Sequence, residues 1–321
     1  MKLMDIYFSL KSDIDVVERR LHDEVHTPQR NLKKASTHLL KAGGKRIRPI
    51  FVLLAGKFGN YDVDRLTKVA TALELIHSAT LVHDDVIDDA ALRRGTPTVK
   101  AEWGNRMAMY TGDFILARAL VLISELPNVQ FHQLLSKSIV SIVEGEIEQI
   151  RDFYNVDQNL RVYLRRIKRK TALLLAVSTT LGAIVADCKA ETTRALERYG
   201  YFAGMAFQII DDILDLTATS KKLGKPVGND LRQGNLTLPV LYALEHSPER
   251  DVLRAHIHRD MTEAQAVEAI RIVKASGGLE YARQLADRYM EKCLRALEGL
   301  PQIEATRQLT AIAHFINERD H

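Results

Sequence analysis

The chain has 321 residues, of which 46% are hydrophobic and 27% charged, and its formal net charge is +4. A chain of this length can bury a large core, whereas so mild a net charge gives no reason to expect a nucleic-acid partner. The two cysteines, Cys188 and Cys293, form no metal or redox motif, and the first residues lack an export signal. The composition, with only eight prolines, therefore predicts a helix-rich cytoplasmic protein with two packed thiols.

Two helices are expected first. Residues 5–26 carry an apolar stripe at helical spacing, and a second helix runs from about residue 31 to 41. The stretch 43–49, GGKRIRP, then combines two glycines with three basic residues before a helix expected at 50–58. Because the N–H groups at a helix start favour anions, this turn suits a phosphate or diphosphate, with a solvated basic loop as the alternative.

The stretch 77–99 holds the strongest signal, four aspartates within six positions at the end of an apolar helix that begins near Asp62. His77, Asp84 and Asp88 are seven and four residues apart and share one face, so the two aspartates can chelate one cation. Asp85 lies about 100° round the helix and is better placed to act through water or orientation. An all-carboxylate donor set favours Mg²⁺ over Zn²⁺.

A surface acidic helix end is the alternative interpretation of this cluster. Carboxylates at a helix C-terminus oppose the macrodipole, so the placement implies compensation by a metal or by Arg93 and Arg94.

Two features follow in the middle of the chain. Three glutamates at 144, 146 and 148 have the spacing of a solvated or interfacial face. Lys170 and Thr171 stand where a densely basic segment enters the apolar run 173–186, a place from which a cation and a hydroxyl can face a cleft. A lysine extended along the helix surface is the alternative. The run has 14 residues, too few to span a membrane, and predicts a buried core helix.

A second acidic motif lies in a predicted helix over 194–217. Asp211 and Asp215 are four residues apart, and Gln208, Asp212 and Asp215 fall on one side. Two such motifs in apolar helices are expected to face each other across one helical bundle. The glycine-rich basic segment 221–235 that follows predicts a mobile flap beside an anionic ligand, and the absence of a linker predicts one domain over 1–321.

These residues indicate metal-assisted chemistry on a diphosphate rather than nucleophilic catalysis, because no Ser-His-Asp or Cys-His arrangement is present. Mg²⁺ held by Asp84, Asp88 and Asp211 would neutralise the charge that develops as an allylic C–O bond breaks. Apolar helix walls would exclude water from the carbocation, and a second substrate at the basic turn would attack it.

At this point the chain resembles a known family, the trans-isoprenyl diphosphate synthases. The matching stretches cover nearly the whole chain in the same order: GGKRIRP (43–49), ELIHSATLVHDDVIDDAALRRGTPT (74–98), KT (170–171), FQIIDDILD (207–215) and LGKPVGNDL (223–231). The resemblance implies an all-α, single-domain helical bundle with a central cleft. It implies trans condensation of isopentenyl diphosphate units onto an allylic primer such as farnesyl diphosphate.

The resemblance also implies residue roles. Isopentenyl diphosphate would contact Lys45, Arg48, His77 and Arg94; the allylic diphosphate would contact Arg93, Lys170, Thr171, Gln208 and Lys225; and the metal ligands would be Asp84, Asp88 and Asp211, with Lys170 also catalytic. The released diphosphate would act as the final base. Family members often carry lysine in a Gly-Lys-x-Thr segment where this chain has Asn235. The positive charge of that lysine is therefore expected to come from Lys225 instead.

Product length follows from the helix that precedes Asp84. A growing product would pass Thr80, Ala79 and Ile76, and an aromatic side chain there would block it early. Two of the three side chains are small, which predicts a long product. By resemblance to the catalytic subunits of two-component family members, that product is heptaprenyl diphosphate for a menaquinone side chain, and the partner is a smaller non-identical subunit, with a homodimer as the alternative.

Two other functions stay open at this stage. A class I terpene cyclase also uses DDxxD and magnesium, but it needs no turn for a second substrate and commonly lacks a second DDxxD. A non-catalytic or regulatory helical subunit would be expected to lose one or both acidic motifs, whereas this chain keeps both.

Overall fold

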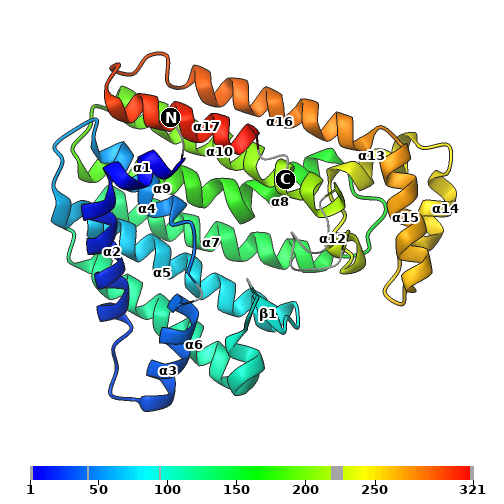
Figure 1. Ribbon diagram of the computed structural model, residues 1–321, viewed down its shortest axis with the longest axis horizontal. Helices are drawn as coiled ribbons and strands as arrows, with labels where there is room; N and C mark the ends of the chain where they lie inside the picture. Colours follow the sequence, from blue (N-terminus) through cyan, green and yellow to red (C-terminus); the bar gives the residue numbers. More distant parts are fainter. Residues whose placement is uncertain (1–2, 42, 94, 218–226, 319–321) are drawn as a thin grey trace. The chain divides into compact units, whose positions relative to one another are not determined.

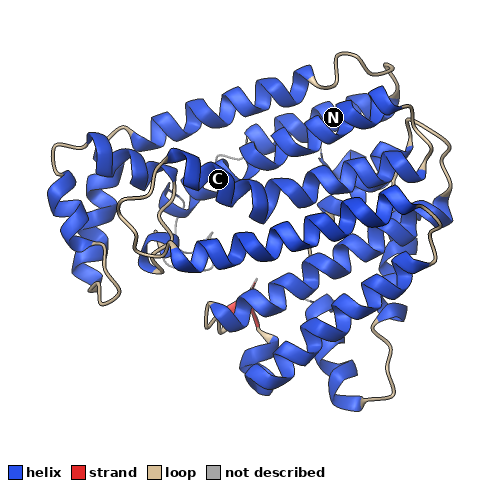
Figure 2. Cartoon of the chain, turned by 180° about the vertical axis from the view of Figure 1, so that it is seen from behind, coloured by secondary structure: helices blue, strands red, loops and turns tan. Residues whose placement is uncertain are grey.

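The structure, a computed structural model, describes residues 3–41, 43–93, 95–217 and 227–318. It is almost entirely helical, which confirms the all-α prediction (Figure 2). Within the described ranges there are only two strands, β1 (Leu92–Arg93) and β2 (Thr96–Pro97), which pair antiparallel.

The chain divides into two compact units. Unit 1 comprises Met1–Leu134, Ser178–Leu196 and Pro301–Gln308, and unit 2 comprises Leu135–Val177, Glu197–Leu300 and Leu309–His321. Each unit is described by itself below. The single domain over 1–321 stays a prediction.

Unit 1 holds the first six helices (Figure 1): α1 (Leu3–Ser9), α2 (Lys11–Glu24), α3 (Arg30–Lys41), α4 (Ile47–Gly56), α5 (Val63–Ile87) and α6 (Val99–Ser124). The helix expected over 5–26 is two helices that separate at Leu10. The Ser9 hydroxyl donates to the carbonyl of Ile6 at 2.8 Å, a local bond that competes with helix propagation.

Helix α5 is central to unit 1. Asp62 caps it by accepting from the Arg65 amide at 3.1 Å, and the helix is buried around most of its circumference from Leu66 to Ala79. Such a helix belongs in a core. It packs along α6, as Figure 1 shows. Of the described helices, α6 alone is long and apolar enough to cross a membrane by length and composition; 39% of its apolar window is buried, and one side of it packs along α5.

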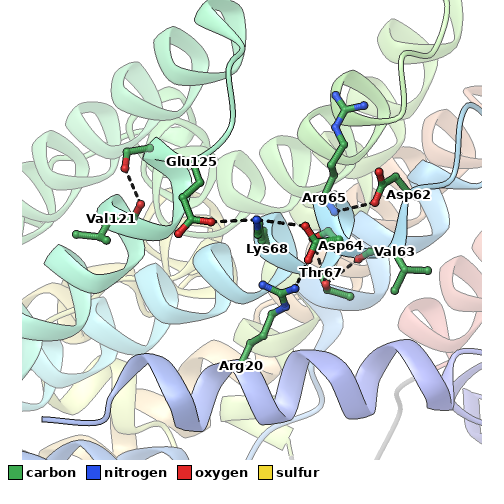
Figure 3. A network of polar contacts seen from close by, with 10 residues as sticks. Arg20, Asp62, Val63, Asp64, Arg65, Thr67, Lys68, Val121 and Glu125 are labelled. Carbon is green, nitrogen blue, oxygen red and sulfur yellow. Dashed lines mark hydrogen bonds and ion pairs between the residues drawn. The ribbon is translucent and has the colours of Figure 1, made fainter.

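A chain of ion pairs ties α2, α5 and the end of α6 together at the surface of unit 1 (Figure 3). Arg20 contacts Asp64, Lys68 contacts Asp64 at 3.2 Å, and Lys68 also contacts Glu125 at 2.9 Å. Exposed pairs contribute little singly, but this network fixes the start of α5, the helix that carries the first acidic motif.

Unit 2 takes most of its residues from the later elements: α7 (Val129–Arg151), α8 (Leu160–Ile167), the π-helical turn η1 (Lys168–Ala172), α9 (Leu173–Val185), α10 (Ala190–Thr217), α12 (Asn229–Arg232), α13 (Leu238–His246), α14 (Arg250–His256), α15 (Glu263–Ala275), α16 (Gly278–Arg295) and α17 (Glu304–Asn317). Helices α7, α9, α10 and α17 have residues in both units. The predicted core helix at 173–186 corresponds to α9, and most of its side chains are buried.

Candidate functional site

The first acidic motif occupies the last turn of α5. Asp84 is half-buried, and Asp88 is the exposed residue that ends the helix, with its amide donating to the Asp84 carbonyl at 2.8 Å. The following residue, Asp89, has a left-handed backbone (φ 52°), so the chain leaves the helix there. The two carboxylates expected to chelate a cation therefore stand one turn apart at an accessible helix end.

Asp85 has a different environment. It is 2% exposed, and Arg93 of β1 donates to its Oδ1 from Nε at 2.8 Å and from the terminal guanidinium nitrogen at 2.7 Å. Compensation of the acidic cluster by Arg93 is thereby confirmed. Arg94 lies outside the described residues.

The three basic residues of the 43–49 turn divide into distinct roles. Arg46 is 8% exposed, has a left-handed backbone (φ 47°) and stands at the start of α4. Its guanidinium donates to both carboxylate oxygens of Glu18, at 2.6 and 3.2 Å, and to Glu74 of α5 at 2.9 Å. These two carboxylates hold the buried guanidinium of Arg46 and so fix the turn, with Lys45 exposed and Arg48 half-buried on either side of it.

The fixed turn also moves the helix start. The helix expected at 50–58 runs from Ile47 to Gly56. It begins three residues earlier than expected because Arg46, with its left-handed backbone, ends the turn.

His77 and Arg93, both predicted site residues, line one small pocket together with Arg46, Glu74 and Ser78. Among the residues expected along the product path, Ile76 and Ala79 are each 2% exposed. Thr80 is half-buried, and its hydroxyl donates to the His77 carbonyl at 2.8 Å. Their effect on product length stays a prediction.

In unit 2 a chain of hydrogen bonds joins η1 to the second acidic motif. The Thr171 hydroxyl donates to the Gln208 amide oxygen at 2.6 Å, and the Gln208 amide nitrogen donates to Asp212 Oδ1 at 2.8 Å. The Tyr163 hydroxyl donates to the other oxygen of Asp212 at 2.7 Å. Asp212 is thus held from both sides, next to Asp211.

Asp212 is 3% exposed, and this burial raises its pKa from 3.8 to about 7. The negative charge of Asp230 adds to the rise in pKa, while the hydrogen bonds from Gln208 and Tyr163 oppose it. Its fixed carboxylate suits a positioning role better than direct contact with a ligand.

The π-helical turn that presents Lys170 and Thr171 is compressed between two glycines. A Cβ on Gly145 of α7 would lie 2.6 Å from the Arg169 Cβ, and one on Gly204 of α10 would lie 2.5 Å from the Ala172 Cα. Both neighbouring helices therefore lie so close to the turn that only glycine fits at these two positions. The extra residue of a π-turn redirects side chains, and such turns are frequent at functional sites.

The spacing of the α7 glutamates predicted a solvated or interfacial face, and two of these glutamates pair with basic residues of η1. Lys170 donates to Gln149 Oε1 at 3.2 Å and lies 3.7 Å from Glu146, and Arg169 pairs with Glu148 at 2.9 Å. Glu146 and Glu148 are half-buried, because the basic residues of η1 cover them. The pairing also rules out a lysine that merely extends along its own helix.

The remaining residues of the second motif connect to the segment that follows it. Asp211 is half-buried, while Asp215 is 3% exposed and accepts from the Asp230 amide at 3.2 Å, which fixes the start of α12. Asn235 is half-buried, and its side-chain oxygen accepts no hydrogen bond from the part of the chain described. Lys225 and most of the predicted flap lie outside the described residues.

Sequence reasoning missed the residues that support the site from a distance: Tyr163, Gln149, Arg46 and Glu74. Arg46 and Glu74 are bonded to each other and lie 28 residues apart in the chain, and Tyr163 lies 49 residues from its partner Asp212. Gln149 accepts a hydrogen bond from Lys170 of the π-turn. Nothing in the sequence distinguishes Arg46 from its basic neighbours Lys45 and Arg48.

The acidic residues offer carboxylate oxygens only, which is the donor chemistry that fits Mg²⁺. Asp84 and Asp88 belong to unit 1 and Asp211 to unit 2. Across the described ranges, no three His, Cys, Asp or Glu side chains are grouped as they would be around a metal ion.

The sequence profile of polyprenyl synthetases matches residues 29–273. The chain belongs to the polyprenyl synthetase family. It is 51% identical to heptaprenyl diphosphate synthase component 2 of Bacillus subtilis (strain 168), over 99% of this chain and 91% of that protein. These matches confirm the prediction of a long-chain trans-prenyl diphosphate synthase.

Two solved structures are closely similar. Heptaprenyl diphosphate synthase from Staphylococcus aureus has a TM-score of 0.94 and 41% identity, with 97% of this chain and 99% of that chain covered. A polyprenyl synthase from Caulobacter crescentus CB15, complexed with calcium and isoprenyl diphosphate, also has a TM-score of 0.94, with 33% identity over 100% of this chain and 98% of that chain. The predicted fold class is therefore confirmed.

Proposed function

We propose that this synthase elongates an allylic primer, farnesyl diphosphate, with isopentenyl diphosphate to heptaprenyl diphosphate, destined for a menaquinone side chain. The heptaprenyl synthases among its relatives support the product length. The observation that carries the chemistry is the hydrogen-bonded chain Thr171–Gln208–Asp212–Tyr163, which fixes the side chain of Asp212, the neighbour of Asp211 in the sequence.

Asp84, Asp88 and Asp211 are the proposed ligands of Mg²⁺, and the calcium complex of the Caulobacter enzyme supports a divalent ion. When bound, the ion neutralises the negative charge that develops on the diphosphate as its C–O bond breaks. The protein's own contribution is to orient the carboxylates. Asp85 and Asp212 are tied to Arg93 and to the Gln208–Tyr163 pair, so they do not compete for the ion.

The allylic diphosphate is proposed to lie against Arg93, Lys170, Thr171 and Gln208, with Lys225 and the isopentenyl contact Arg94 supplied by segments outside the described residues. The hydrogen bond from Lys170 to Gln149 supports this role for Lys170, because it holds the side chain away from the surface of its own helix. Isopentenyl diphosphate is proposed to bind Lys45, Arg48 and His77. Arg46 anchors that turn through Glu18 and Glu74, and it is not among the residues proposed to contact the substrate.

We further propose that the chain works in the cytoplasm with a smaller, non-identical subunit. The relative's designation as component 2 supports a partner. A homodimer is the competing arrangement, and the mass of the complex in solution distinguishes the two.

The test is incorporation of labelled isopentenyl diphosphate with farnesyl diphosphate and Mg²⁺, with products resolved by chain length, for the chain alone and with a candidate small subunit. A heptaprenyl product that disappears in Asp84→Asn and Asp211→Asn supports the proposal. The exposed Asp260→Asn is the matched control and should retain activity.

Two results would redirect the assignment. Consumption of the allylic diphosphate without isopentenyl diphosphate would indicate a terpene cyclase. No incorporation with or without the partner would indicate a non-catalytic subunit.

A further inference from the structure

Helix α3 presents an unusual surface. Its sequence, RNLKKASTHLLK, contains four formal positive charges and no acidic residue. The charged residues are Arg30 and the lysines that follow it by three, four and eleven residues, Lys33, Lys34 and Lys41. This spacing puts all four on one face of the helix, and all four are exposed. The opposite face, with Ala35, Ser36 and Leu40, is buried in unit 1.

Among the described residues, none neutralises these four charges. No ion pair or side-chain hydrogen bond joins any of them to another described residue. Two other lysines of unit 1 are paired with carboxylates: Lys68 contacts two of them and Lys100 contacts one.

The basic side chains line a shallow groove of about 470 Å³ together with Thr37, His38 and Trp103. Trp103, from the first turns of α6, is the only tryptophan of the chain. It is half-buried: one side packs against the core cluster around Val82 and Ala108, and its ring meets His38 edge-on at 5.2 Å. The groove shares no lining residue with the pocket of His77 and Arg93.

We propose that this groove, which we term the α3 basic groove (Arg30, Lys33, Lys34, Thr37, His38, Lys41 and Trp103), docks the protein onto an anionic membrane surface. Clustered lysines and arginines are attracted to the negative potential of anionic lipids, and tryptophan favours the headgroup region. A membrane surface also suits the reaction, because the product, a long-chain prenyl diphosphate, is an amphiphile that partitions from water into a bilayer.

The inference does not depend on the proposed metal ligands or primer. Unpaired charge on one face selects an extended negative surface over a small anion, since the four groups line a groove open to solvent rather than converge on one point. An acidic protein or a soluble polyanion is the competing partner, and the test separates it from lipid.

The experiment uses the full chain and the fluorescence of Trp103 as a probe located in the groove. Vesicles of phosphatidylcholine alone are compared with vesicles containing about one third phosphatidylglycerol, both by co-sedimentation and by the emission maximum of Trp103. We expect binding and a blue shift with the anionic vesicles only, reversed at about 1 M salt, where the Debye length falls to ~3 Å.

The decisive comparison is between two triple variants of equal charge. Lys33→Gln/Lys34→Gln/Lys41→Gln should weaken vesicle affinity roughly 100-fold, at about fivefold for each charge near the surface. Lys137→Gln/Lys189→Gln/Lys274→Gln removes three exposed lysines elsewhere and should weaken it less than about tenfold. Vesicle-free condensation activity and thermal unfolding of both variants serve as the folding control.

Three results would overturn the proposal. One is equal binding to neutral and anionic vesicles. Another is an equal loss of affinity in the two triple variants. The last is a Trp103 shift with soluble polyglutamate but none with anionic vesicles, which would assign the groove to an acidic protein instead.

Discussion

The hydroxyl of Thr171 donates to the amide oxygen of Gln208 across 2.6 Å, and this bond links the π-helical turn η1 to the second acidic motif. It sets the orientation of the Gln208 amide, whose nitrogen then donates to Asp212. A residue proposed to touch the allylic diphosphate is therefore positioned by another of the same set.

Thr171→Val removes the hydroxyl with little change in shape. The hydroxyl is proposed to contact the charged allylic diphosphate, and a hydrogen bond to a charged group is worth ~1.5–3 kcal/mol. We therefore expect the KM for the allylic diphosphate to rise about tenfold or more. The KM for isopentenyl diphosphate should stay within a factor of about two. Thr193→Val, at a half-buried position of α10 whose hydroxyl donates to the Lys189 carbonyl, is the control, and equal changes in both KM values would contradict the assignment.

Tyr163→Phe leaves one oxygen of the buried Asp212 without its donor. The variant should lose about 1–3 kcal/mol in the free energy of unfolding, measured with urea at a pH above 7, where Asp212 is charged. In Tyr154→Phe the lost bond is to a backbone carbonyl from a half-buried ring, so about 1 kcal/mol or less is expected. A larger loss in Tyr154→Phe than in Tyr163→Phe would be inconsistent with a buried anchor at Asp212.

Gly145→Ala places a methyl group 2.6 Å from the Arg169 Cβ, so the π-turn must shift. We expect a loss of about 1–3 kcal/mol in unfolding free energy and a fall in turnover, since Lys170 moves with the turn. Gly299→Ala meets nothing within 4 Å and should be neutral within about 1 kcal/mol. Full activity in a destabilised Gly145→Ala would separate the turn from catalysis.

Both thiols should resist alkylation in the folded protein. Burial, with the charge of Asp187, raises the pKa of Cys188 from 9.0 to about 11, and Cys293 is fully buried with a raised pKa as well. Because the folded state holds these protons more tightly, the thiols lower stability as pH rises from 9 toward 11. Iodoacetamide labelling at pH 8 followed by mass spectrometry should modify neither cysteine until urea is added. Rapid labelling of Cys188 in the native state would refute the burial argument.

Ala79→Phe introduces an aromatic ring at a position of α5 that is 2% exposed. If the product passes this position, the mean product length should shift to shorter chains, resolved by reversed-phase chromatography. Overpacking will also cost about 1–3 kcal/mol, so the variant is assayed well below its unfolding temperature. An unchanged length distribution in a folded variant would exclude Ala79 from the product path.

The sequence by itself determined the fold class and the chemistry. Helical periodicity and the scarcity of proline predicted the all-α class, and two DDxxD motifs with GGKRIRP predicted a diphosphate-handling site, because carboxylate spacing and helical period are local properties of the chain. Its stretch Leu173 to Ala186 was identified as a core helix for the same reason.

Only the tertiary structure decided which residues share a task. Arg46 looked equivalent to Lys45 and Arg48 until Glu18 and Glu74, both 28 residues away, were found around its guanidinium. The spacing of the α7 glutamates left a solvated and an interfacial face open, and the structure places η1 against two of them. Asp212 likewise accepts a hydrogen bond from Tyr163, 49 residues away in the chain. Such partners depend on how helices pack, and packing brings together residues whose separation in the chain carries no periodic signal.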